Sequence, residues 1–122
     1  SWLSSIYRSH ASNQGKGMAL ARKDVNLELE DRLIIEATIR GDRNAGRLLY
    51  ERYQEQIWRV VRRLVPDNDE AMELCQETWL KAFSSLDKFR NDSRFSTWVL
   101  RIAINRVNSR SRWKKVRNHI SV

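Results

Sequence analysis

FRNDSRFSTWVLRIAINRVNSRSR, residues 89–112, is the stretch that decides the fold expected for this chain of 122 residues. It opens with a polar turn, and from residue 95 its apolar side chains recur every three or four positions, which predicts a loop that leads into a helix. The helix is expected to start at Ser96, whose hydroxyl suits an N-cap, and to end among residues 109–112. Its buried stripe is expected to contain Val99, Ile102, Ala103 and Val107.

The opposite face of this helix carries a polar row at the same spacing. The row consists of Trp98, Arg101, Asn105, Asn108 and Arg112. Residues 90–122 hold nine Lys/Arg and one acid, Asp92, and this balance of +8 equals the net charge of the whole chain. Basic groups neutralise phosphates, while aromatic and carboxamide groups stack on bases and bond to their edges. We therefore expect a nucleic-acid surface, with a solubilising basic segment as the alternative.

Composition indicates one helical domain. One proline, four glycines and the absence of alternating apolar runs predict an all-α fold, a compact bundle of about four helices. No apolar run reaches the roughly 18–20 residues that a membrane span needs, so a cytoplasmic chain without membrane insertion is expected. The single cysteine, Cys75, excludes an internal disulfide and leaves no metal-ligand cluster, so no cofactor or metal is expected.

Two further helices are expected before residue 65. The first covers residues 31–40, with Leu33, Ile34 and Ala37 in the core and Gly41 as a left-handed stop. The second covers residues 43–64. Its apolar stripe is Leu49, Tyr53, Ile57, Val60, Val61 and Leu64, and its outward residues are Glu51, Arg52, Glu55, Arg59, Arg62 and Arg63.

A third helix is expected after Pro66, with Asp67 as its N-cap. Its buried face is Ala71, Leu74, Cys75, Thr78, Trp79, Ala82, Phe83 and Leu86. Outside that face lie Glu73, Gln76, Glu77 and Leu80. An acidic surface with an apolar residue set in it is either a solvated face or a docking surface for a basic protein partner.

The ends of the chain differ from this middle part. Residues 1–24 are expected to be an arm or linker, either foreign to the domain or disordered, ahead of a domain at residues 25–115. A short amphipathic helix at Trp2, Leu3, Ile6 and Tyr7 that covers the docking surface is a second hypothesis for the arm. Residues 113–117 lack a strong period, and residues 116–122 are expected to begin a linker.

Several blocks, in this order, resemble region 2 of the extracytoplasmic-function (ECF) sigma factors of the sigma-70 family. They are GD at residues 41–42, LYERY at 49–53, QETWL at 76–80, LDKFR at 86–90, FSTW at 95–98 and RIAIN at 101–105. The resemblance implies a sigma factor domain without enzymatic activity, which binds core RNA polymerase and recognises and melts the minus-ten promoter element. It also implies an anti-sigma factor as a partner, and a region 4 domain that would follow the end of this chain.

Roles for particular residues follow from the same resemblance. Binding to the clamp helices of the largest polymerase subunit is implied for Glu73, Gln76, Glu77 and Leu80. Binding to the non-template strand of the minus-ten DNA, with capture of a flipped base by the loop, is implied for Phe89, Arg90, Asn91, Asp92, Ser93, Arg94, Phe95, Ser96, Thr97, Trp98, Arg101, Asn105, Asn108 and Arg112. The alternative from another class is a helical interaction module, or a mimic of a sigma domain, that does not bind DNA.

Overall fold

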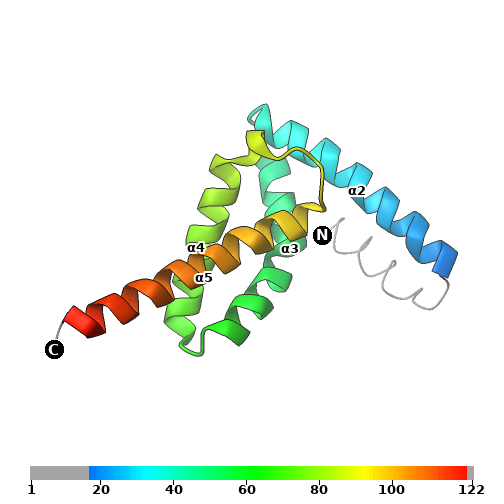
Figure 1. Ribbon diagram of the computed structural model, residues 1–122. Coiled ribbons are helices and arrows are strands. Elements are labelled where there is room, and N and C mark those ends of the chain that lie inside the picture. Colours follow the sequence, from blue (N-terminus) through cyan, green and yellow to red (C-terminus); the bar gives the residue numbers. More distant parts are fainter. Residues whose placement is uncertain (1–16, 121–122) are drawn as a thin grey trace. The chain divides into compact units, whose positions relative to one another are not determined.

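The computed structural model describes residues 17–120, including the side chains of residues 27–119, and this part of the chain contains helices and no strand (Figure 1). The elements are α2 (Gly17–Ile39), α3 (Arg43–Leu64), α4 (Asn68–Ser84), the short 3-10 helix η1 (Leu86–Lys88) and α5 (Phe95–Ile120). The all-α prediction is confirmed. The short helix expected at residues 2–7 lies outside the described residues.

The chain divides into two compact units, residues 1–53 and 54–122. In the first unit, α2 ends at a turn where Gly41 has a φ of 104°, so the predicted left-handed stop is confirmed. Asp42 then accepts hydrogen bonds from the backbone N–H groups of Asn44 and Ala45, at 3.0 and 3.2 Å, and caps α3. The predicted bounds of α3, residues 43–64, are confirmed.

The start and the inner face of α2 differ from prediction. The helix begins at Gly17 rather than at residue 31, so residues 17–24, which were assigned to the arm, are helical. Leu33 is 67% exposed, and Ile35 is the buried residue. The buried face of α2 contains Asp31 and Ile35. Because Asp31 is charged, this face does not form the continuous apolar stripe by which a buried helix face is recognised in a sequence.

A charged network explains why an aspartate lies on that face. Arg52 was expected to point outward, but its side chain is only 3% exposed. Its guanidinium pairs with Asp31 at 2.5 Å and with Glu30 at 2.7 Å, and Tyr53 donates its hydroxyl hydrogen to Asp31. Burial raises the pKa of Asp31 above its usual value, against the opposing effect of the hydrogen bonds from Tyr53 and Arg52.

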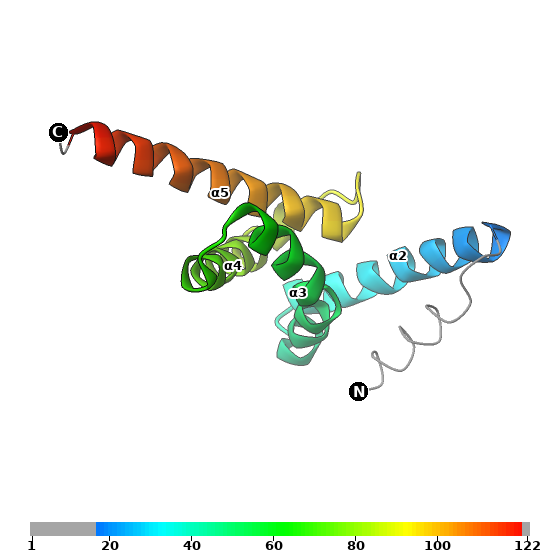
Figure 2. The same cartoon turned by 90° about the horizontal axis from the view of Figure 1, so that it is seen from below.

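The second unit is built on the packing of α4 against α5 (Figure 2). Asp67 caps α4 as predicted, accepting from the backbone N–H groups of Asp69 and Glu70 at 2.9 and 3.2 Å. The predicted face of α4 is buried, with Cys75 and Phe83 half-buried at its margin. Thr78 is buried and satisfied, because its hydroxyl donates to the Leu74 carbonyl at 2.7 Å.

The predicted stripe of α5 is buried as well, apart from Ile102, which is half-buried. The bounds of α5 were wrong at both ends. The Arg94 carbonyl accepts from the N–H of Trp98 at 3.1 Å, so Arg94 rather than Ser96 occupies the N-cap position. The helix continues to Ile120, and its last turns extend beyond α4 (Figures 1 and 2). Every side chain from residue 111 to 119 is exposed. A segment that packs on no core needs no apolar period, which is why residues 113–117 gave no helical signal.

One core prediction in α3 was also wrong. Leu64, at the end of the helix, is exposed, and Val65 is buried in its place. Arg62 donates to the carbonyls of Val65 and Pro66 at 3.2 and 2.5 Å and so holds the turn that directs Val65 inward. Among the described residues, no helix has the length and apolarity required to cross a membrane.

Candidate nucleic-acid and protein interfaces

Aromatic residues anchor the loop between η1 and α5. Phe89 and Phe95 stand at its two ends, and their rings meet edge to face with centroids 5.9 Å apart. Trp98 lies 5.2 Å from Phe89 and 5.9 Å from Phe95, and Phe95 also meets Trp79 of α4 at 6.4 Å. Both phenylalanines are buried, Phe95 to 3% exposure, and Trp98 is half-buried. These three predicted DNA-binding residues therefore lie in the aromatic core beneath the loop.

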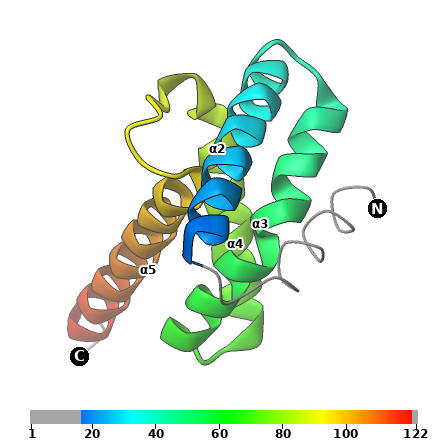
Figure 3. The ribbon, with the colours of Figure 1, turned by 90° about the vertical axis from the view of Figure 1, so that its right-hand side faces the viewer.

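The course of the loop between η1 and α5 can be followed in Figure 3. Most of its polar side chains are exposed to solvent. Arg90, Asn91, Asp92 and Arg94 are exposed, while Ser93 is half-buried and donates to the Arg94 carbonyl at 3.3 Å. Asn91 has a φ of 59°, in the left-handed region that asparagine tolerates better than most residues. The result is a tight polar turn held between two buried rings.

The polar row of α5 begins within two turns of this loop. Its exposed members are Arg101, Asn105, Asn108 and Arg112. Ser96 and Thr97, which were also predicted to bind DNA, are half-buried in the first turn of α5. Two guanidinium and two carboxamide groups in one line can contact phosphates and base edges of a nucleic-acid strand.

The face of α4 predicted for docking is accessible. Glu73, Gln76 and Leu80 are exposed, Leu80 to 72%, and Glu77 is half-buried. An exposed leucine alone needs no explanation, but one set among carboxylates and a carboxamide suits a protein partner that is apolar and basic.

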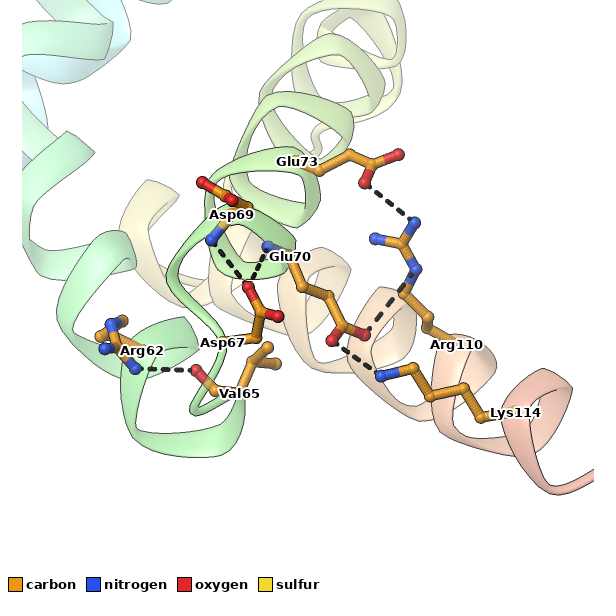
Figure 4. A network of polar contacts seen from close by, with 8 residues as sticks. All are labelled: Arg62, Val65, Asp67, Asp69, Glu70, Glu73, Arg110 and Lys114. Carbon is orange, nitrogen blue, oxygen red and sulfur yellow. Dashed lines mark hydrogen bonds and ion pairs between the residues drawn. The ribbon is translucent and has the colours of Figure 1, made fainter. Parts of the chain in front are cut away.

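An ion-pair network that the sequence analysis missed links α4 to α5 (Figure 4). Glu70 pairs with Lys114 at 2.7 Å and approaches Nε of Arg110 at 3.9 Å, while Glu73 binds Nη2 of Arg110 at 3.1 Å. The hydrogen bond that Arg110 donates to the Glu73 carboxylate is the main cause that raises the pKa of Arg110 above its usual value. Two of the nine basic residues of the C-terminal segment, Arg110 and Lys114, therefore form ion pairs with carboxylates of α4.

Residues 27–119 contain no group of three His, Cys, Asp or Glu side chains placed to hold a metal ion. Burial raises the pKa of the Cys75 thiol, which disfavours the thiolate that nucleophilic chemistry requires.

Comparison with known proteins identifies the family of this chain. Residues 49–116 match the family model described as sigma-70 region 2. The chain is 42% identical over 78 residues to the ECF RNA polymerase sigma-E factor of Escherichia coli, a match that covers 64% of this chain and 40% of that protein. It is 43% identical over 76 residues to the RNA polymerase sigma-H factor of Pseudomonas aeruginosa, covering 62% of this chain and 39% of that protein. The matched part thus spans about 40% of the length of these curated relatives.

A solved structure shares the fold. It is described as the NMR structure of the complex formed by an engineered region 2 of sigmaE in complex with GTAAAA. The similarity has a TM-score of 0.64 at 34% sequence identity and covers 71% of this chain and 90% of that chain. Since the family model also covers more than half of the chain, this protein belongs to the sigma-70 region 2 family, in its ECF branch.

Proposed function

We propose that this chain is the part of an ECF sigma factor that binds core RNA polymerase and recognises and melts the minus-ten promoter element. The observation that carries the proposal is the exposed polar loop at residues 90–94 followed, on the same helix, by the exposed row of α5. The similar region 2 bound to GTAAAA gives independent support. The domain acts by binding and carries out no reaction of its own.

In this proposal the loop captures a flipped base of the non-template strand. Extruding a base costs a few kcal/mol of stacking, which contacts to the extruded base must offset. The exposed side chains of Arg90, Asn91, Asp92 and Arg94 can reach base edges and phosphates. Phe89 and Phe95 are buried, so we assign them the role of holding the loop in shape rather than stacking on the base.

The row of α5 binds the strand next to the captured base. Arg101 and Arg112 are suited to phosphates, and Asn105 and Asn108 to base edges, where a carboxamide offers both a donor and an acceptor. Phosphate contacts position the strand, and base contacts supply its sequence preference.

In this proposal, α4 carries the surface that docks on polymerase. Leu80 is the apolar anchor, surrounded by Glu73, Gln76 and Glu77, and the partner is the clamp-helix pair of the largest polymerase subunit. An anti-sigma factor that covers Leu80 would compete directly with polymerase. The same α4 surface would serve an interaction module that does not bind DNA, which remains the second candidate function.

Binding of single-stranded DNA separates the two candidates. Fluorescence anisotropy at one fixed salt concentration would compare labelled GTAAAA, a scrambled hexamer and a panel of other A/T-rich hexamers. A sigma domain should prefer one sequence by tenfold or more, since each base contact contributes about 1–3 kcal/mol. Equal affinity for every oligonucleotide would favour the interaction module, because phosphate binding alone does not depend on sequence.

A further inference from the structure

A hollow of about 240 Å³ adjoins the acidic face of α4. It is lined by Glu77 of α4 and by Arg106, Ser109, Arg110, Trp113 and Arg117 of α5. Three guanidinium groups therefore face one carboxylate, and Trp113 adds a flat apolar wall that is 65% exposed. A concave surface that combines cationic donors with an exposed indole is suited to an anionic group carried on an apolar stem.

Arg110 is held in place at this hollow before any ligand arrives. Its Nη2 binds Glu73 at 3.1 Å, and its Nε lies 3.9 Å from Glu70. Its remaining nitrogen, Nη1, is buried and has no hydrogen-bond partner in the part of the chain that the structure describes. The carboxylates of Glu70 and Glu73 therefore fix the position of this guanidinium at the hollow, whereas Arg106 and Arg117 are exposed and free to turn toward an anionic group.

The position of the hollow on α5 argues against DNA as its occupant. At about 100° of rotation per residue, its lining residues lie roughly 125° around the helix from the row Arg101, Asn105, Asn108 and Arg112. A strand bound along that row would therefore face away from the hollow. Glu77, in contrast, belongs both to the hollow and to the docking face of α4.

We propose that the hollow is a second half of the polymerase-docking surface and binds a carboxylate side chain, Asp or Glu, of the polymerase segment that docks on α4. This inference rests on the proposed function and adds the chemistry of the partner. The docked segment carries basic residues opposite Glu73 and Glu77 and an acidic residue opposite Arg106 and Arg117. Because a reversed segment would bring like charges together, the paired patches also set the direction in which the segment binds.

Charge reversal tests the inference with a matched control on the same helix. The variant R106E/R117E changes two exposed arginines of the hollow, and R101E/R112E changes two exposed arginines of the row. Both change the net charge equally, so general attraction to polymerase or DNA changes alike. Affinity of the full chain for core RNA polymerase and for a single-stranded minus-ten oligonucleotide would be measured at one salt concentration, with circular dichroism to confirm helicity.

The hollow variant should lose core affinity by tenfold or more and keep DNA affinity within about threefold, and the row variant should show the reverse pattern. Equal loss of core affinity in both variants would overturn the inference, as would a hollow variant that loses only DNA affinity, since the occupant would then be a phosphate. If the unchanged chain does not bind core polymerase, the proposed function itself fails, which is a different result.

Chemical cross-linking identifies the occupant directly. A carbodiimide joins a lysine amine to a carboxylate only when the two are in contact, so Arg117→Lys is compared with Arg112→Lys in complex with core polymerase. A cross-link from residue 117 to an Asp or Glu of polymerase, absent from residue 112, supports the inference. Absence of any cross-link from residue 117, or the same one from residue 112, contradicts it.

Discussion

Arg52 offers a sharp test of the structure, because it is a charged residue in a place where the sequence alone predicted solvent. We expect Arg52→Met to destabilise the protein by about 3–5 kcal/mol, since methionine retains most of the aliphatic stem but leaves the buried Asp31 without its ion partner. Native domains have about 5–15 kcal/mol of total stability, so this change would remove a large part of it.

A matched control lies two turns further along the same helix. Arg59 pairs with Glu55 at 2.8 Å, but both side chains are exposed, so Arg59→Met should cost only about 0.3–0.5 kcal/mol. Urea unfolding followed by circular dichroism measures both values at pH 7. If the two variants lose the same stability, Arg52 is not the buried partner of Asp31 and the network is wrong.

The network also predicts how stability depends on pH. Because burial raises the pKa of Asp31, the folded protein holds this proton at pH values where the unfolded chain has released it. The contribution of Asp31 to stability therefore decreases as pH rises from the ordinary carboxyl pKa through the raised one. In the Arg52→Met variant the pKa of Asp31 should rise further, because the neighbouring positive charge is lost. The loss of folding stability caused by the substitution should therefore become smaller as pH falls toward 4, where Asp31 becomes protonated and neutral. If the stability lost in Arg52→Met is the same at every pH, the loss does not come from a buried Asp31 charge without a partner.

Three further substitutions test the remaining assignments. Leu80→Asp should abolish binding to core polymerase while leaving helicity and thermal stability nearly unchanged, because this side chain is 72% exposed; unfolding instead would place it in the core. Asn105→Ala should weaken binding to a single-stranded minus-ten oligonucleotide by about 1–3 kcal/mol without affecting a scrambled one, as measured by anisotropy. Phe95→Ala should lower the free energy of unfolding by about 3–5 kcal/mol in urea titrations, because it empties the aromatic core beneath the loop; lost DNA affinity with unchanged stability would show that the ring contacts the base instead.

Local signals accounted for much of the fold. The apolar stripes of α4 and α5, the stop at Gly41 and the cap at Asp67 were all predicted, because each depends on residues within a turn or two of one another. The same is true of the exposed row of α5 and the exposed Leu80, which follow from helical spacing once the buried stripe is known. The sequence motifs shared with the family also predicted that these helices form a sigma region 2 fold.

Charged residues with partners far along the chain could not be assigned in this way. Arg52 binds Asp31 from 21 residues away, and Lys114 binds Glu70 from 44 residues away. The spacing of residues along the sequence shows which face of a helix a residue occupies. It does not show whether a side chain of opposite charge on another segment packs against that face. Charged residues were therefore predicted to be exposed to solvent, and this prediction was wrong for Arg52.

Periodicity and local hydrogen bonding were enough to predict the helical class, the bounds of α3, the turn at Gly41 and the N-cap of α4, and the sequence motifs indicated the family. Tertiary structure decided which members of the predicted surfaces remain available to a partner. Because α4 packs against α5, Arg110 and Lys114 form ion pairs with Glu73 and Glu70. Packing beneath the loop buries Phe89 and Phe95. Burial and ion pairing are properties of two segments that meet in space, so the folded chain alone decides them.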